Sequence, residues 1–205
     1  MNKLKKIFKI IICSLLLFPM LYSIDTKAYD NNTEGQLKTY LLNKGVSEDK
    51  ITKLILKLAN NEEIDALKTY AIPEEITKVN INNSIIETKV FKDGSVIETK
   101  AIYLGISSFY RRGISCGTGA CWGDYHFEKY TSGVATLSCW ASIEYSSQYG
   151  KISSVWQPSC YPGTLIAGPS LNHYGDSSVI SMSGSNNGRY CSANFRVGPG
   201  GISIE

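Results

Sequence analysis

The residues with the clearest capacity for covalent chemistry are one cysteine and one histidine, Cys121 and His173. A cysteine attacks a carbonyl group as its thiolate and a histidine takes up the proton, so this pair is the minimum of a thiol hydrolase. A thiolate must stay reduced, however, and Cys116 stands five residues away, where it can oxidise Cys121. We therefore keep thiol hydrolysis as a second alternative only, and the sequence predicts a protein with no enzymatic activity and no catalytic residues.

Metal and carboxylate chemistry are not favoured by the residue spacing. A structural zinc ion takes close pairs of cysteine and histidine ligands, and the run Cys116-x4-Cys121-x4-His126 is a poor match to that pattern. A glycosidase needs two carboxylates that flank one bond, and nothing in the sequence brings two acids together. We expect no bound metal and no cofactor. The acids of the C-terminal half that such a pair would use are Asp124, Glu128 and Asp176.

Aromatic side chains are the more informative feature. All three tryptophans follow residue 105, among many tyrosines. Trp140 alternates with the expected inward-facing residues of a strand, and exposed aromatic rings on a sheet form a platform for sugars or for a protein partner. The alternative is that N-terminal helices pack on this face and bury the rings. The binding surface that we consider comprises Trp122, Trp140, Trp156 and Tyr145.

The first 28 residues have the three parts of an exported precursor. Lysines at positions 3, 5, 6 and 9 precede an apolar run at residues 10–21, and Thr26-Lys27-Ala28 offers small residues where a signal peptidase reads them. The apolar run is shorter than the about 20 residues of a membrane span. We predict a cleaved signal peptide at residues 1–28, a secreted mature chain, and no membrane association after cleavage.

The predicted cleavage changes the charge of the protein. The whole chain carries a net charge of +3, but residues 1–28 hold five lysines and one acid, so the mature chain has 16 basic and 17 acidic residues. No basic patch for nucleic acid remains. The charges are also uneven, because residues 29–104 hold 22 of the 33, whereas residues 105–205 hold 15 of the 18 glycines. This break predicts two parts that fold differently.

Five cysteines remain after cleavage, so at most four can pair within the chain and one is left over. Cys116 and Cys121 close a short loop and form the disulfide that we expect first. Cys139 and Cys191 both lie on the inward faces of expected strands. They can pair across the core, or one of them can pair with Cys160. Burial is the commonest state of a leftover thiol.

Helical periodicity is confined to residues 29–75. Thr33 is expected to cap a helix that Gly45 ends, and Ser47 to cap a second helix with Ile51 and Leu54 on its apolar face. Short amphipathic helices do not fold alone. They must pack on each other and on the rest of the chain.

From residue 76 onward the hydrophobic period is typical of strands. Residues 85–91 and 96–104 are rich in β-branched side chains, and Lys92-Asp93-Gly94-Ser95 between them is a hairpin turn signal. Further strands are expected at residues 107–115, 126–130, 134–145, 151–157, 179–183 and 190–197. The predicted fold class is α+β. It comprises a helical segment (29–75), a β-hairpin (76–104) and a disulfide-containing, mainly antiparallel β-sandwich-like domain (105–205).

The layout as a whole resembles that of a group of exported proteins. A lysine-rich signal, the stretch Tyr40-Leu41-Leu42-Asn43-Lys44-Gly45-Val46-Ser47, the hairpin Phe91-Lys92-Asp93-Gly94-Ser95-Val96 and a Ser-, Gly- and Tyr-rich β domain follow in that order. This order resembles short exported proteins of Gram-positive Firmicutes that have no assigned function. The resemblance implies secretion by a Gram-positive bacterium and carries over no catalytic residue.

These observations predict a secreted, non-enzymatic β-domain protein that binds a cell-surface, glycan or protein partner outside the cell. The first alternative is a bacteriocin-like or toxin-like effector in which residues 29–104 are a pro-segment, because the composition changes near residue 105.

Overall fold

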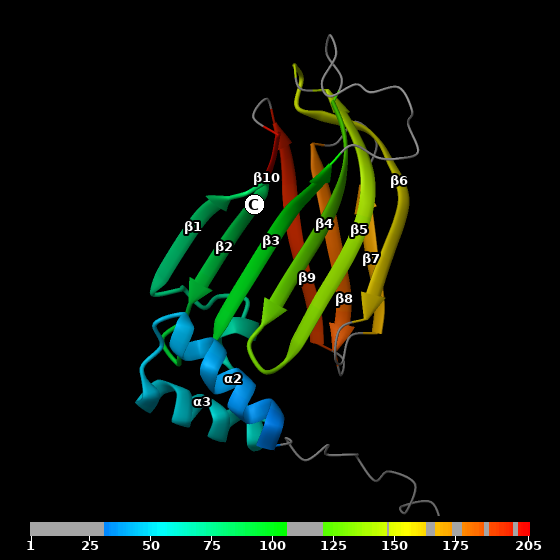
Figure 1. The fold of residues 1–205 in the computed structure, drawn as a ribbon. Coiled ribbons are helices and arrows are strands. Elements are labelled where there is room, and N and C mark those ends of the chain that lie inside the picture. Colours follow the sequence, from blue (N-terminus) through cyan, green and yellow to red (C-terminus); the bar gives the residue numbers. More distant parts are fainter. Residues whose placement is uncertain are drawn as a thin grey trace, which may run out of the picture.

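Antiparallel β-structure dominates the computed structural model, whose described residues form two sheets and two α-helices (Figure 1). The protein is therefore broadly α+β with a β-rich domain, as the sequence predicts. The signal peptide, Cys116 and the strand expected at residues 107–115 lie outside the described residues. The structure describes residues 31–105, 121–146, 148–162, 167–173, 178–186, 189–198 and 201–205.

Two helices form the N-terminal part, α2 (Asn31–Asn43) and α3 (Glu48–Ala59), followed by the short 3-10 helix η2 (Asp65–Leu67). Gly45 has a φ of +78°, the left-handed conformation that ends a helix, as expected. The predicted cap at Thr33 is wrong, because Thr33 lies inside α2, which is already helical at Asn31. Ser47 is the N-cap residue of α3, as expected, but its side chain makes no capping hydrogen bond.

Six strands form the first sheet, in the order β1-β2-β3-β4-β5-β6, and four form the second, in the order β10-β9-β8-β7. Figure 1 shows the second sheet behind the first and the helices at one end of the first. The strands of the first sheet are β1 (Glu75–Ile81), β2 (Ser84–Val90), β3 (Val96–Gly105), β4 (Cys121–Thr131), β5 (Ala135–Ser146) and β6 (Lys151–Pro162). Those of the second are β7 (Ala167–His173), β8 (Val179–Asn186), β9 (Arg189–Gly198) and β10 (Gly201–Ile204).

The predicted hairpin corresponds to β2 and β3, which pair from Ser84↔Ile102 to Val90↔Val96. It is not a separate unit, because β3 also pairs with β4 over eight residue pairs. The first sheet thus runs through the composition break near residue 105. On the other side of β2 lies β1, and the two strands are joined by Asn82 and Asn83. Both asparagines have a positive φ, which is the geometry of a two-residue hairpin turn.

Several strands lie partly or wholly outside the ranges that were expected to be strands. Residues 158–162 belong to β6, residues 167–173 form β7, and residues 184–186 belong to β8. The prolines and glycines of the first two stretches are typical of turns, but the pairings accommodate them through register shifts, at Trp140/Ser142 in β5–β6 and at Ala167/Ser170 in β7–β8.

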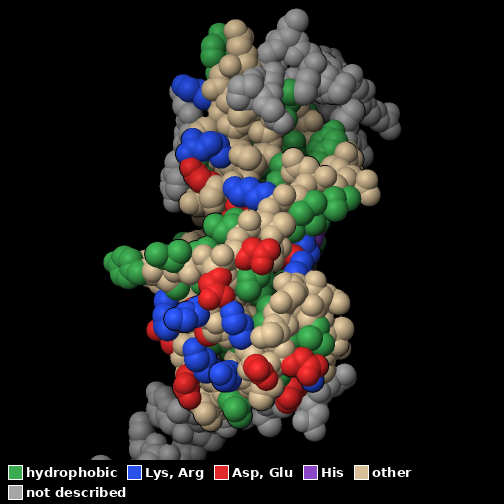
Figure 2. Space-filling view, turned by 90° about the vertical axis from the view of Figure 1, so that its left-hand side faces the viewer, with side chains coloured by type: hydrophobic (Ala, Val, Ile, Leu, Met, Phe, Trp, Pro, Cys, Tyr) green, Lys and Arg blue, Asp and Glu red, His purple; other side chains and the backbone are tan. Residues whose placement is uncertain are grey.

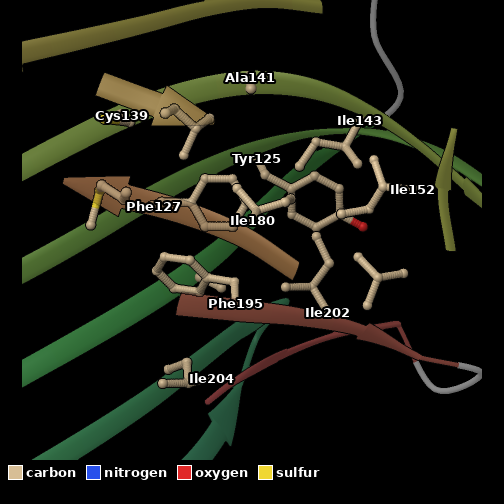
Figure 3. Close-up of a cluster of buried hydrophobic side chains, with 14 of the residues drawn as sticks. Tyr125, Phe127, Cys139, Ala141, Ile143, Ile152, Ile180, Phe195, Ile202 and Ile204 are labelled. Atoms are coloured by element: carbon tan, nitrogen blue, oxygen red, sulfur yellow. The ribbon is translucent and has the colours of Figure 1, made fainter. Parts of the chain in front are cut away.

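The main hydrophobic core lies between the two sheets. Strand β5 alternates regularly between buried and half-buried residues, and Leu137 and Ile143 on its inner face are fully buried. Phe127 of β4 meets Phe195 of β9 with ring centroids 4.4 Å apart. Figure 3 shows these rings among aliphatic side chains from strands of both sheets.

A second core joins the helices to one end of the first sheet. Leu41 of α2 and Leu54 of α3 are fully buried and pack with Val96 at the β2–β3 turn. Tyr40 lies edge-on to Tyr130 of β4, with ring centroids 4.7 Å apart. The helices therefore cover the end of the sheet near these turns, and Trp140 is not among the described residues of this core.

Candidate functional site

A cleft of about 520 Å³ opens at the end of the two sheets opposite the helices. We call it the end cleft. It lies between the β1–β2 turn, the inner faces of β3, β4 and β5, and the start of β10. Its lining residues are Asn80, Ile81, Asn82, Asn83, Ser84, Ile85, Ala101, Tyr103, Cys121, Trp122, Tyr125, Tyr145, Gly201 and Ile202.

Three tyrosines from neighbouring strands form the aromatic wall of the end cleft. Tyr103 and Tyr125 lie with ring centroids 5.4 Å apart, and Tyr125 is hydrogen-bonded to Tyr145. Burial raises the pKa of Tyr125, and the hydrogen bond to Tyr145 raises it further. The Tyr125 hydroxyl is therefore uncharged at physiological pH and can both donate and accept hydrogen bonds.

Gly123 leaves room for the tyrosine wall. A Cβ atom at this position would collide with the ring of Tyr103, and it would lie 3.1 Å from Cε2 of Tyr125. Because glycine has no side chain, the Tyr103 ring can lie across β4. The aromatic wall thus depends on a glycine in the middle of the sheet's inner face.

Amide groups from the β1–β2 hairpin form the opposite wall. Asn80, Asn82 and Asn83 are exposed, and each offers one carbonyl acceptor and one NH₂ donor. Asparagine also tolerates the left-handed backbone that the turn requires at Asn82 and Asn83. No charged side chain is among the described residues that line the cleft. The end cleft therefore combines aromatic rings with neutral hydrogen-bonding groups.

The structure divides the four aromatic residues of the expected surface. Trp122 and Tyr145 line the end cleft. Tyr145 shares the inner face of β5 with Ile143, and only 7% of it is exposed. Trp140 lies on the outer face of β5, and the side chain of Trp156 lies outside the described residues. The three asparagines were missed, although the pair Asn82-Asn83 is itself a turn signal.

Trp140 stacks on a histidine of the neighbouring strand. Its ring is nearly parallel to that of His126, with centroids 4.1 Å apart. Burial lowers the pKa of His126, and the nearby Lys100 lowers it further, while Glu128 opposes them. His126 is therefore mainly neutral at physiological pH, and its Nε2 lies 3.0 Å from the Ser138 hydroxyl oxygen. The two stacked rings lie on the outer face of the first sheet, and neither lines the end cleft.

Cys139 and Cys160 form a disulfide between adjacent strands, with their Cα atoms 4.0 Å apart. The alternative that Cys139 pairs with Cys191 is wrong, since Cys191 lies on β9 of the facing sheet and is free and buried. Antiparallel pairing brings Cys160 directly opposite Cys139 in the neighbouring strand. Cys191 lies on the facing sheet, and stacked sheets are about 10 Å apart. Cys121 is disulfide-bonded, and its predicted partner Cys116 lies outside the described residues, so that pairing stays a prediction.

The described part of the chain contains neither a cluster of metal ligands nor a membrane-spanning helix. Within it, no three His, Cys, Asp or Glu side chains gather as a metal site. The helices in the same ranges are too short or too polar to cross a membrane. No family model, no curated protein and no solved structure matches the chain.

Proposed function

We propose that this protein is a secreted, non-enzymatic β-sandwich that binds a neutral, hydroxyl-rich ligand, a glycan of a cell surface, in the end cleft. The observation that supports this function best is the lining of the cleft, which joins three tyrosines and a tryptophan to three asparagine amides and has no charged side chain among its described residues.

The chemistry of a sugar fits this lining on two counts. The C–H faces of a sugar ring are apolar and pack on aromatic rings such as Tyr103 and Trp122. Its hydroxyls exchange hydrogen bonds with amide and phenol groups, which Asn80 and Tyr125 supply. The volume of the cleft, about 520 Å³, lies in the range of small-molecule sites. An ionic ligand would find no counter-charge among the described lining residues.

The state of the cysteines supports a binding role over thiol chemistry. The sulfur of Cys121 is held in a disulfide and is not a thiolate. His173, the histidine that the thiol hydrolase hypothesis requires, lies on β7 of the second sheet, whereas Cys121 begins β4 of the first.

Binding should depend on Trp122 and not on Trp140. We expect the mature protein to bind a subset of neutral structures on a glycan array, and W122A to weaken this binding about 30-fold or more in calorimetry, the effect of losing an aromatic anchor. N82G should also weaken it, because glycine keeps the positive φ of the turn but removes the amide. W140A is the matched control and should bind like the wild type.

Two results would contradict this function. One is the absence of binding to every glycan tested. The other is loss of binding in W140A with retention in W122A, which would place the ligand on the outer face of β5 instead. Because W122A alters a partly buried residue, its circular dichroism and melting temperature must first match those of the wild type.

The pro-segment hypothesis is not part of this proposal. Removing residues 29–104 would take β1, β2 and β3 out of the six-stranded sheet and would uncover one side of β4. We therefore expect mass spectrometry of culture supernatant to find a single mature chain that begins near Tyr29. A stable, abundant species that begins near residue 105 would show that the N-terminal part is removed after all.

A further inference from the structure

Strand β1 is an open edge of the first sheet. It pairs with β2 on one side and has no described strand on the other, and all seven of its residues are exposed. Its apolar side chains are well exposed, Ile76 at 54%, Val79 at 37% and Ile81 at 54%. Figure 2 views the molecule from this side and shows hydrophobic side chains between two groups of charged residues.

The edge lacks the features that normally keep sheet edges apart. Natural edge strands carry a bulge, a proline or a charge that projects over the edge. The seven residue pairs of β1 and β2 run without a register shift, so there is no bulge, and β1 contains no proline. The charge in its middle, Lys78, is drawn back over the sheet, because its Nζ lies 2.7 Å from Glu87 of β2.

We propose that β1 pairs antiparallel with β1 of a second copy of this chain, which gives a two-fold dimer with one continuous sheet. A two-fold axis is the commonest symmetry of protein dimers, and it brings the same strand together from both subunits. Main-chain hydrogen bonds along the open edge would then be satisfied in both copies.

The sequence of β1 is complementary to itself in one register. With the axis at Val79, each Val79 faces the other, Thr77 faces Ile81, and Lys78 faces Asn80. These β-branched pairs on the outer face are the kind that stabilises antiparallel strands, and no like charges stand opposite each other. A register centred on Lys78 would instead place two lysines opposite each other, which is unfavourable. The Val79 register is therefore the one that we assign.

The interface is small, so the dimer should depend on protein concentration. One strand from each copy buries less than the roughly 1,200 Å² of a typical stable interface. The segment that leads into β1 adds two strongly exposed apolar residues, Tyr70 at 94% and Ile72 at 85%. Sedimentation velocity of the mature wild-type protein should show a monomer–dimer equilibrium, and V79K should weaken it at least 10-fold, because it places two lysines at the axis.

Cysteine cross-linking tests the register directly. V79C should form a covalent dimer under mild oxidation, because facing Cβ atoms of paired strands lie about 4.5–5.5 Å apart. T77C alone should not, since Thr77 faces Ile81, whereas T77C/I81C should. Y149C, at a site on the β5–β6 turn that is more exposed than Val79, is the control for random collision. All these positions are exposed, so the variants should fold.

Three results would overturn the proposal. The first is a wild-type protein that stays monomeric up to about 1 mM, a concentration that reveals even weak association. The second is V79C cross-linking no faster than Y149C. The third is faster cross-linking of T77C than of V79C, which would show a different register. Because no glycan is present in these assays, their outcome does not depend on the function of the end cleft.

Discussion

Replacing Phe127 with alanine should destabilise the fold by about 3–5 kcal/mol, the usual cost of removing a buried aromatic side chain. Phe127 is fully buried between the sheets, where it packs on Phe195 of β9 and is stacked with Tyr125 of β4 (Figure 3). Alanine would leave a cavity that these rings cannot fill, because they are fixed by paired strands of opposite sheets. Urea unfolding followed by tryptophan fluorescence measures the free energy of unfolding.

Two further variants show whether the loss arises from contact between the sheets. F127L should cost less than F127A, because leucine refills most of the space. In the double variant F127A/F195A the loss of stability should be smaller than the sum of the two single losses. Each single variant already removes the contact between Phe127 and Phe195, and this contact can be lost only once. A loss below about 1 kcal/mol in F127A would show that the two sheets do not share this core.

The second large effect should come from Asp93 in the β2–β3 turn, because one carboxylate joins this turn to the helical part. Its Oδ2 accepts hydrogen bonds from the Asp65 backbone N–H at 2.8 Å and from Lys57 Nζ at 3.0 Å. Its Oδ1 accepts hydrogen bonds from the Ser95 backbone N–H at 3.0 Å and from the Ser95 hydroxyl at 2.6 Å. D93A should destabilise the protein by about 2–4 kcal/mol, since it leaves these part-buried donors without an acceptor.

The loss in D93A should appear first in the helices. Far-ultraviolet circular dichroism at 222 nm reports mainly on α2 and α3, whereas fluorescence reports on tryptophans that all lie after residue 105. D93N should lie between the wild type and D93A, because an amide keeps one acceptor oxygen. K92A, at the exposed neighbouring position, should have little effect. Equal stability of D93A and K92A would show that the carboxylate does not hold the helices in place.

The same carboxylate makes the stability depend on pH. Burial acts to raise the pKa of Asp93, but the hydrogen bonds from Ser95, the Asp65 backbone and Lys57 outweigh burial and lower it. A pKa that is lower in the folded state means that the folded protein binds protons less readily than the unfolded chain. The stabilisation is therefore complete well above pH 4, the usual pKa of an aspartate, and is lost as the pH falls through the folded pKa.

Two buried glutamates, Glu87 and Glu98, also make the folded state less stable as the pH falls. Burial acts to raise the pKa of Glu98, but hydrogen bonds from Lys44 and Lys100 lower it overall, and Lys78 and Lys89 do the same for Glu87. Glu98 also anchors the end of α2 through Lys44. Acid unfolding of the wild type should thus begin below about pH 5. D93A should lose less stability over this range, so its difference from the wild type should shrink as the pH falls.

Local sequence patterns predicted the elements that form between near neighbours. The hairpin of β2 and β3 was predicted correctly because Gly94 supplies the positive φ of its turn and β-branched residues flank it. The alternation in β5 correctly predicted that Leu137 and Ile143 face the core. Strand β1 was missed as a strand of its own, because its apolar residues are not buried and leave no clear pattern of inside and outside.

The candidate site was less predictable, because its residues come from distant parts of the chain. The aromatic surplus pointed to a binding surface, but only the pairing of β3, β4 and β5 brings Tyr103, Tyr125 and Tyr145 to one wall. The asparagines of the other wall belong to the β1–β2 hairpin, which local sequence can specify. The cleft that they line also needs residues of β10, which come from the far end of the chain. The sequence alone gave no reason to choose Trp122 over Trp140.

Local patterns in the sequence were enough to predict the α+β class, the N-terminal helices and the turn between β2 and β3, because each of these depends on interactions between residues a few positions apart. The tertiary structure decided which distant residues meet. It paired Cys139 with Cys160 and left Cys191 free, since strand register, and not the inward direction of a side chain, sets which cysteines are neighbours. It also opened the end cleft, because a cleft between the sheets exists only where the two sheets stack.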